Sequence, residues 1–370
     1  MKRVILAALA TMVLAAPAGA AEKLKFAVVP KAMNNPFFDI ARDGCTKRAK
    51  ELGNVECLYR GPIEHEPATQ VQIIQDLITQ RVDGLAISVS DVGAAIGVIK
   101  AAREAGIPVI TFDADAPGSA REAYIGTNNK DLGRALGEML VKAQPHGGTY
   151  SMVSGGPAAA NLNERLEGVR EVAGKTGWKE VSGSPTYCND DPALAVQQLN
   201  DLTTAHADLN AVVAVGGWPL FVPEGYRNFV DANADRFKSG KLVAVSADTL
   251  PSELQLLKAG YVAALVGQRP FEMGEKSMDT LLALHDGKPV QEIIYTGVDR
   301  VTKTMSESSS NSAAQAAGAS FGMAALHQLR RWNRCVRSVG ESNEGYWPKT
   351  VVQEGWSPSE TISSKLRAHG

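Results

Sequence analysis

The sequence predicts an α/β protein built from two similar lobes, and three observations support this prediction. Apolar runs rich in Val and Ile alternate with amphipathic stretches along most of the 370-residue chain. The runs lack polar alternation, as do strands of parallel sheets that are covered on both faces. A weak internal repeat relates residues 83–89 to residues 209–215. Together these features indicate two Rossmann-like lobes that face a shared cleft.

The apolar runs and amphipathic stretches give the expected elements in chain order. We expect strands at residues 26–29, 55–59, 85–89, 109–112, 149–153, 211–215, 242–245 and 262–266. We expect helices at residues 40–52, 68–80, 94–105, 130–143, 194–205 and 271–284. In each half of the chain, one strand leads into an aspartate, Asp113 or Asp248. Sheets of this kind bind ligands at the carboxyl ends of their strands, so both aspartates are expected in the cleft.

Residues 1–20 have the pattern of a secretory signal peptide. Lys2 and Arg3 form a basic start, residues 4–16 an apolar stretch, and Ala-Gly-Ala a small-residue cleavage site. The apolar stretch is shorter than a membrane span usually needs, and no Cys follows the cleavage site to carry a lipid. A short N-terminal anchor helix is the alternative. We expect an exported, soluble protein that begins near Ala21.

Composition excludes some function classes and leaves the pairing of cysteines open. Removing the two basic residues of the signal segment changes the formal net charge from −2 to about −4, which offers nothing to attract nucleic acid or an anionic membrane. No pair among Cys45, Cys57, Cys188 and Cys335 has CxxC spacing, so a metal or thioredoxin-like motif has no support. An oxidising compartment permits a bridge between Cys45 and Cys57, whereas free buried thiols are equally compatible.

The sequence contains no recognisable catalytic motif. Its six His residues show no HExxH or other paired spacing, and no GxxxxGK[ST] phosphate loop occurs. The Gly-Gly-Pro turn at residues 155–157 is only a weak glycine signal. Neither a nucleophile with a base nor a metal-ligand spacing can be assembled from these patterns. We therefore expect a protein that is not an enzyme and needs no cofactor or metal.

One short stretch, residues 31–38, combines two amides, a proline and two adjacent aromatic side chains. It follows an expected strand and leads into an expected helix, which places it at the carboxyl end of that strand. The simpler interpretation is a capped helix start with Phe37 and Phe38 in the core. The functional interpretation is a flat aromatic wall beside hydrogen-bonding amides. Such a wall suits a sugar ring, which has apolar C–H faces and a rim of hydroxyls.

The Asn-Asn-Pro-Phe-Phe sequence at residues 34–38 and the Ile-Thr-Phe-Asp-Ala-Asp sequence at residues 110–115 resemble a known family. They are similar to type I periplasmic sugar-binding proteins, the ribose-binding class of ABC transporters. The resemblance covers roughly residues 24–304. It implies the type I periplasmic-binding-protein fold, with two Rossmann-like lobes joined by a three-crossover hinge near residues 126–127, 268–270 and 297–298.

The resemblance also implies which residues contact the sugar. In the family, the amide at the position of Asn35 binds sugar hydroxyls, and the aromatic residues at Phe37 and Phe38 flank the ring. Further implied contacts are Asp113, Arg165, Asp248 and Gln268. A carboxylate suits this role because it accepts hydrogen bonds from adjacent hydroxyls, and the fork of an Arg donates to hydroxyl oxygens. An exposed Arg on a solvated helix face is the alternative for Arg165.

This sequence departs from the ribose-binding pattern at several positions. Ala114 stands where the pattern has Arg, and the Asp115 that follows, together with Lys31, resembles the rhamnose and autoinducer-2 binding branch. The alternative for Asp115 is a cap of the following turn. A Gly-Gly-Trp-Pro turn replaces the usual Gln-Asn-Asp type, so Trp218 is either a second aromatic wall or packing between the lobes. Cys188 lies near the family's remaining aromatic contact and does not reproduce it.

These observations predict a substrate-binding protein that captures a sugar, either a monosaccharide or a polyol, in the cleft between the lobes. It would deliver this sugar to the membrane permease of an ABC transporter, as a monomer in the periplasm, without binding nucleic acid. A sensor of autoinducer-2 or of a sugar, which presents its ligand to a chemoreceptor or signalling partner, is the alternative. A LacI-type regulator core shares the two lobes but needs an N-terminal helix-turn-helix, so it is more distant.

Domain boundaries are expected at the three crossovers. We expect a signal peptide at residues 1–20, an N-terminal lobe at 21–126 plus 270–297, and a C-terminal lobe at 127–269 plus 298–305. Residues 306–370 depart from the family: they begin with Ser, Glu and Asn and continue into a basic run. We expect a solvated or disordered tail, with a partner site or a fused or frame-shifted end as alternatives.

Truncation after Thr304 should leave sugar binding within about twofold, because no implied contact lies beyond this residue. Isothermal titration of the truncated and untruncated mature chains with the same sugar measures the effect. A tenfold loss of affinity, about 1.4 kcal/mol, would show instead that the tail belongs to the binding fold.

Overall fold

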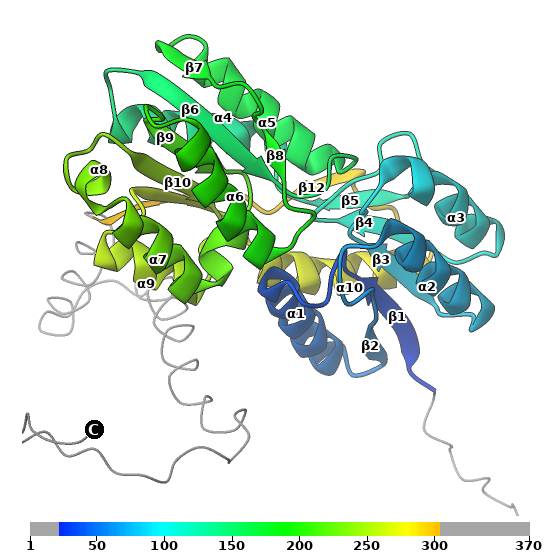
Figure 1. The fold of residues 1–370 in the computed structure, drawn as a ribbon. Coiled ribbons are helices and arrows are strands. Elements are labelled where there is room, and N and C mark those ends of the chain that lie inside the picture. The colour runs from blue at the N-terminus through cyan, green and yellow to red at the C-terminus, as the bar shows by residue number, and fades with distance from the viewer. Residues whose placement is uncertain (1–21, 304–370) are drawn as a thin grey trace, which may run out of the picture. The chain divides into compact units, whose positions relative to one another are not determined.

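Two mainly parallel sheets, with helices on both faces of each, make up the described part of the chain, residues 22–303 of the computed structural model (Figure 1). The expected α/β architecture with two lobes is therefore confirmed. The predicted signal peptide and the tail from Ser306 onward lie outside the described residues.

The first sheet has the strand order β12-β5-β4-β3-β1-β2, with all neighbouring strands parallel. Its strands are β1 (Leu24–Val29), β2 (Val55–Tyr59), β3 (Gly84–Ile87), β4 (Val109–Phe112), β5 (Ala123–Gly126) and β12 (Ile293–Tyr295). Helices α1 (Pro36–Leu52) and α10 (Pro270–His285) cover one face, and α2 (Pro67–Thr79) and α3 (Val92–Glu104) cover the other. Along β1, Phe26 and Val28 pack toward the first pair, and Ala27 and Val29 toward the second.

The second sheet has the order β13-β11-β10-β9-β6-β7, with β8 paired to β6, and β13 alone among the described strands runs antiparallel to its neighbour. Its strands are β6 (Gly148–Ser154), β7 (Trp178–Glu180), β8 (Thr186–Tyr187), β9 (Ala211–Ala214), β10 (Val243–Ala247), β11 (Ala264–Gly267) and β13 (Asp299–Thr302). The helices around it are α4 (Asn129–Ala143), α5 (Ala160–Ala173), α6 (Pro192–Ala205), α7 (Pro223–Ala232), α8 (Ala234–Lys238) and α9 (Pro251–Ala259), with a 3₁₀ turn at Trp218–Phe221.

All the strands and helices expected from the sequence are present; β2 and β4 have the expected bounds, and the others have shifted ends. Helix α1 begins four residues earlier than expected, at Pro36, because proline fits the first helical position and the Asn35 side chain caps the backbone N–H of Phe37. Strands β5, β7, β8, β12 and β13 and helices α7, α8 and α9 were not expected. Several of these strands have only two to four residues, too few to show a periodic pattern.

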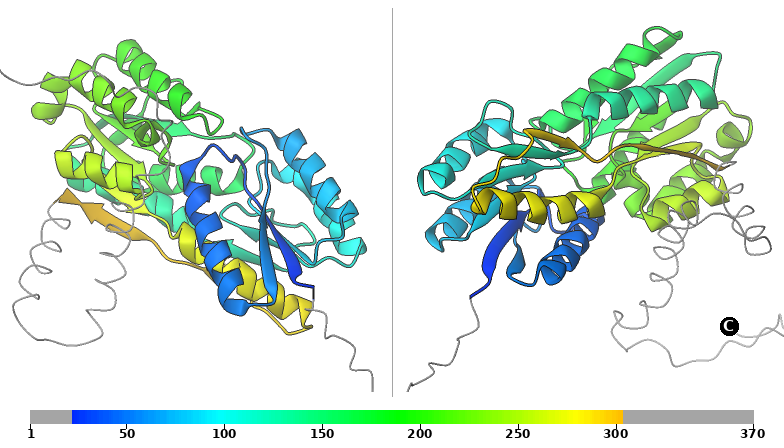
Figure 2. Two further views of the ribbon diagram at one scale, coloured as in Figure 1. Left: turned by 90° about the horizontal axis from the view of Figure 1, so that it is seen from below. Right: turned by 180° about the vertical axis from the view of Figure 1, so that it is seen from behind.

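The chain passes between the sheets three times, after β5, after β11 and after β12, as the expected three-crossover hinge requires (Figure 2). The Thr127 hydroxyl donates to Gln268 Oε1 at 3.1 Å, and the Thr296 N–H donates to the Gly126 carbonyl at 2.9 Å. The crossovers are thus hydrogen-bonded to one another. The lobe boundaries, residues 21–126 plus 270–297 and 127–269 plus 298–305, remain a proposal.

Helix α1 is held from two sides, and it is the helix that carries the aromatic stretch. A disulfide joins its Cys45 to Cys57 of β2, with the two Cα atoms 6.0 Å apart, so the bridge that the sequence left open is present. On its other side, α1 crosses α10 so closely that a Cβ on Gly274 would overlap the carbonyl oxygen of Ala41. Only a glycine fits at this crossing.

Gly274→Ala should lower the free energy of unfolding by about 1–3 kcal/mol, because the added methyl group must push α1 and α10 apart. Urea unfolding measures this change. Gly97→Ala is the matched control: Gly97 lies inside α3 with no atom within 4 Å of the new methyl group, so this variant should gain roughly 0.5–1 kcal/mol of helix propensity. Equal effects at both positions would show that the crossing tolerates a side chain.

Candidate functional site

Three aspartates beside the crossovers share an uncommon backbone conformation. Asp113 follows β4, Asp248 follows β10 and Asp190 precedes α6, with φ of 57°, 71° and 60°. Among the described non-glycine residues, only Arg81 and Asn189 also have positive φ. Non-glycine residues adopt this region rarely, and such strain concentrates at functional sites. Backbone conformation thus marks the two aspartates expected from the sequence and adds a third.

Asp113 is buried, and two cationic side chains lie near its carboxylate but beyond hydrogen-bond distance. Its Oδ2 accepts a 2.6 Å hydrogen bond from the hydroxyl of Ser88, which follows β3. The Lys31 ammonium lies 4.0 Å from Oδ2, and Arg165 Nη2 lies 3.9 Å from Oδ1. Both distances exceed a hydrogen bond, and Oδ1 has no hydrogen-bond partner among residues 22–303. Asp113 therefore has acceptor capacity left for a ligand.

Arg165 is fixed by three hydrogen bonds from its guanidinium. Nε donates to Asn129 Oδ1 at 2.9 Å, Nη1 to the Val215 carbonyl at 2.9 Å and Nη2 to Gln268 Oε1 at 2.7 Å. The residue is 2% exposed, so the alternative of a surface Arg on a solvated helix face is wrong. These partners come from α4, from the residue that follows β9 and from a crossover, and they hold the charge in one position beside Asp113.

Asp248 is bound at both oxygens by the second lobe itself. Gln268 Nε2 donates to its Oδ1 at 2.8 Å, and the Gly217 N–H donates to its Oδ2 at 3.0 Å. Burial raises the pKa of Asp248 above its usual value, and the charge of Arg165 opposes this shift. Gln268 thus connects Asp248 with Arg165, and the two residues expected to contact the sugar also support each other.

Glu253 lies behind Asp248 and was not expected from the sequence. Its side chain is fully buried: Oε2 accepts from the Leu250 N–H at 2.6 Å, and Oε1 has no hydrogen-bond partner in the described part of the chain. Burial, with a smaller contribution from the charge of Asp248, raises the pKa of Glu253 well above its usual value. The site therefore favours a protonated, neutral carboxyl at this position.

The aromatic stretch forms the capped helix start that was the simpler interpretation of the sequence. Phe37 packs edge-on against Phe38, with ring centroids 5.2 Å apart, and Phe38 packs edge-on against Phe112. Both are almost fully buried at the start of α1. Asn35 Oδ1 caps this helix. In the described part of the chain its Nδ2 group makes no hydrogen bond, so this group is available to donate to a ligand. The capped helix start is thus confirmed, and the sugar contact stays a prediction.

Asp115 lies in a different environment from Asp113. Arg121 donates to both of its oxygens, at 2.6 and 2.7 Å, and Thr111 Oγ1 donates to Oδ1 at 2.5 Å. The Ala116 N–H also donates to Oδ1, which is the turn cap that the sequence offered as the alternative. Since its acceptors are occupied by the protein, a ligand contact of Asp115 stays a prediction that this geometry does not favour.

Lys31 and Trp218 each donate a hydrogen bond to another residue of the site. Lys31 Nζ donates to Asn161 Oδ1 of α5 at 3.0 Å, which links a loop of the first sheet to a helix of the second. Burial lowers the pKa of Lys31 below its usual value, and the charges of Asp113 and Asp190 oppose this shift. Trp218 is buried, and its indole N–H donates to Asp190 Oδ1 at 2.8 Å.

Sequence reasoning missed Ser88, Asn161 and Asp190, together with His65 from the loop before α2. His65 Nε2 lies 3.7 Å from Asp190 Oδ2. A usable signal was present for Asp190, because an Asn-Asp-Asp-Pro run predicts a turn in which Asn and Asp tolerate positive φ. No local pattern marks His65, whose role depends on a contact with a residue 125 positions later.

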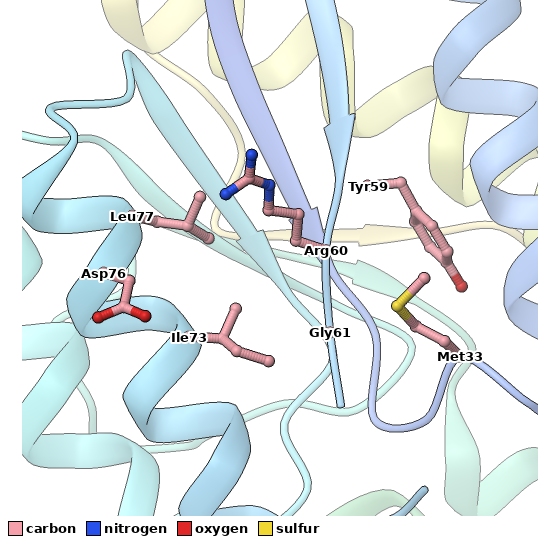
Figure 3. Close-up of a pocket in the computed structure, with 7 residues that line it drawn as sticks. All are labelled: Met33, Tyr59, Arg60, Gly61, Ile73, Asp76 and Leu77. Atoms are coloured by element: carbon pink, nitrogen blue, oxygen red, sulfur yellow. The ribbon is translucent and has the colours of Figure 1, made fainter. Parts of the chain in front are cut away.

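A pocket of about 260 Å³ lies away from these residues, beside β2, the edge strand of the first sheet (Figure 3). It is lined by Met33, Tyr59, Arg60, Gly61, Ile73, Asp76 and Leu77. A second pocket, of about 220 Å³, is lined by Asp115, Arg121, Asn161 and Glu164, among others, and thus adjoins the polar site.

Within residues 22–303, no group of three or more His, Cys, Asp or Glu could hold a metal. No helix in that range is long and apolar enough to cross a bilayer.

Two parallel-sheet lobes, three crossovers and a polar site at the strand ends define a two-lobed binding protein. The family model described as periplasmic binding protein domain matches residues 26–289. The chain therefore belongs to the periplasmic binding protein family, and the resemblance to type I periplasmic sugar-binding proteins is confirmed.

Curated relatives and solved structures agree with this assignment. Ribose import binding protein RbsB of Escherichia coli (strain K12) is 29% identical over 275 residues, which cover 74% of this chain and 89% of that protein. The D-ribose/D-allose-binding protein of Pseudomonas aeruginosa is 28% identical over 295 residues, which cover 76% of this chain and 89% of that one. An ABC transporter solute-binding protein of Burkholderia graminis, solved with D-arabinose, has a TM-score of 0.72 and 34% identity, and the match covers 78% of this chain and 99% of that one.

Glu253→Gln should flatten the pH dependence of stability. The pKa of Glu253 is higher in the folded chain than its unfolded value of 4.5, so its contribution is complete below about pH 4.5 and is lost as pH rises through the folded pKa. Gln has the shape of the protonated, neutral Glu side chain but does not titrate. The free energy of unfolding of the variant, relative to wild type, should therefore rise by up to about 1.4 kcal/mol per pH unit above pH 5, because only the wild type loses stability there. Urea unfolding across pH measures it. The exposed Glu224→Gln is the control, and equal slopes for the two variants would contradict the assignment.

Proposed function

We propose that this protein captures a monosaccharide or polyol between its lobes and delivers it to the membrane permease of an ABC transporter. The observation that carries the proposal is the pair of gaps around Asp113, where Arg165 and Lys31 stop 3.9 and 4.0 Å short of the carboxylate. A hydroxyl donates and accepts at once, so it can satisfy a carboxylate and a cation that do not touch. Sugars present several such groups on neighbouring carbons.

The charges of the site favour a neutral ligand over an anion. Asp113, Asp190 and Asp248 supply three carboxylates, against the cations of Lys31 and Arg165. Arg165 already donates to three protein oxygens, and burial lowers the pKa of Lys31. No cluster of free cations is therefore available among these residues for a carboxylate or phosphate. The names of the relatives, which bind ribose, allose or arabinose, support a sugar.

The remaining side chains divide between the faces and the rim of a sugar ring. Phe37 and Phe38 supply apolar surface for its C–H faces, and Asn35 Nδ2 supplies a donor. Gln268 and Asp248 complete the polar side, and their bonds to each other and to Arg165 reduce the entropy lost when the sugar binds. Trp218 and Lys31 complete the proposed set, whereas the ion pair of Asp115 with Arg121 does not favour a contact of Asp115 with the sugar.

Capture requires the lobes to close on the sugar, and contacts between the sheets indicate how. The Lys31–Asn161 hydrogen bond and the close approach of His65 to Asp190 both join segments on opposite sides of the crossovers. A sugar that contacts Asp113 and Arg165 together binds the closed form best, and it shifts the population toward that form. The closed form then offers both lobes to the permease. The signal-like pattern at residues 1–20 supports a periplasmic location.

A thermal-shift screen of the mature chain with pentoses, hexoses, deoxyhexoses and polyols tests the proposal. Isothermal titration then compares wild type with Asp113→Asn, which keeps the positive φ but removes the charge. We expect a loss of roughly 10- to 100-fold, since a hydrogen bond to a charged group contributes about 1.5–3 kcal/mol. Asp208→Asn, at an exposed position, is the control and should bind as wild type does. If no sugar shifts the melting temperature, or if both variants bind equally well, the proposal fails.

A further inference from the structure

A second pair of polar atoms in the site lacks hydrogen-bond partners. Asp190 Oδ2 and His65 Nε2 are both buried, and neither has a partner in the described part of the chain. Their side chains are 4% and 8% exposed. Leaving a buried polar atom unpaired costs about 1–3 kcal/mol, so two such atoms facing each other require an explanation.

The two atoms do not satisfy each other, but a third atom between them would satisfy both. They lie 3.7 Å apart, which is too long for a hydrogen bond. Since a hydrogen bond to a hydroxyl oxygen spans about 2.8 Å, one oxygen can contact both atoms at once. With the proton of a neutral His65 on Nε2, a single hydroxyl accepts from His65 and donates to Asp190. With the proton on Nδ1, two neighbouring hydroxyls serve, one for each acceptor.

Asp190 is held in place by groups that point it toward this gap. Trp218 Nε1 donates to its Oδ1 at 2.8 Å, so Oδ2 is the oxygen left for another partner. Asn189 and Asp190 are consecutive residues with positive φ, a costly conformation that persists where the surrounding structure fixes it. On the opposite side, a Cβ on Gly156 would clash with the His65 ring, so the loop after β6 approaches this ring closely.

This gap belongs to the same cleft as Asp113. The charge of Lys31 interacts with both Asp113 and Asp190, so the ammonium lies near both carboxylates. His65 and Lys31 come from segments of the first sheet, and Asp190 comes from the second. A molecule bound at Asp113 and extending past Lys31 would therefore meet Asp190 and His65.

We propose that Asp190 and His65 bind a hydroxyl group of the ligand. They would thereby select a fully hydroxylated sugar or polyol over the counterpart that lacks this hydroxyl. This inference rests on the proposed function. A C–H group at this position would leave both polar atoms buried and unpaired, which gives the discrimination. A ligand carboxylate or phosphate here would face the Asp190 charge. Trp218 acts as a positioning residue, because its N–H orients Asp190.

The test uses sugars in matched pairs. D-Ribose, D-galactose and D-glucose are each titrated beside their monodeoxy counterparts, including 2-deoxy-D-ribose and D-fucose, into the full mature chain. The variants are Asp190→Asn, which keeps the positive φ accessible, and Asp191→Asn as the adjacent control. Asp191 is an exposed helix cap whose role Asn also fills. Circular dichroism and melting temperature check that each variant folds.

We expect Asp190→Asn to weaken the best-bound sugar at least tenfold and to weaken one of its monodeoxy counterparts less than threefold, because that counterpart has no hydroxyl to lose. Asp191→Asn should leave both affinities unchanged. Trp218→Phe, which removes the N–H but keeps a ring, should reproduce the Asp190→Asn pattern over the same sugars with a smaller loss. A packing role of Trp218 would weaken every sugar equally.

Two results would overturn the inference, and they differ from failure of the proposed function. If Asp190→Asn weakens every sugar of the panel by the same factor, Asp190 contributes to closure and not to selection. If it binds all of them as wild type does, the gap is filled by water. In both cases the wild type still binds sugar, so the proposed function stands. If the wild type binds none of the panel, the proposed function and this inference fail together.

Discussion

The buried guanidinium of Arg165 is the group on which the rest of the site depends. It is a full charge out of contact with water, and its cost is offset by three protein oxygens and by the nearby carboxylates. Through Gln268 it is connected to Asp248 and to the hydroxyl of Thr127, so it also joins two of the crossovers. Removing it would leave several buried polar groups without partners at once, beside two of the crossovers.

Much of the fold could be predicted because its signals are local and periodic. The continuous apolar runs of β1, β3 and β4, buried on both faces, read directly as parallel strands, and α4 and α10 show clear amphipathic patterns. Four site residues lie in short stretches that resemble a known family: Asp113, Arg165, Asp248 and Gln268. In the structure, Gln268 is hydrogen-bonded to both Arg165 and Asp248, and Asp113 lies beside Arg165 without a direct hydrogen bond. Strands such as β12, with three residues of which only Ile294 packs against the core, leave little trace in the sequence.

The remaining site residues escaped prediction because their roles exist only in three dimensions. His65 lies in a loop, and its close approach to Asp190, which precedes α6, exists only in the folded chain. Trp218 was predicted as an aromatic wall or as packing between the lobes, but no sequence pattern indicated that its indole N–H would donate to Asp190. Glu253 looks like an ordinary first-turn acid of a helix, yet complete burial changes its protonation. Asp115 illustrates the converse, since a suggestive Asp-x-Asp pattern ends in an ion pair with Arg121.

The tight crossing of α1 and α10 has a consequence for how the chain reaches this structure. The two helices lie more than 200 residues apart in sequence, and the first sheet also waits for β12 near the end of the described chain. One face of that sheet therefore stays without its second helix until residue 285 of the 370-residue chain has left the ribosome. Contacts of such long sequence separation slow folding, because the loop must close before any contact can form. A nascent chain that folds late remains threadable, which is the condition a polypeptide must meet if it is to be translocated in extended form.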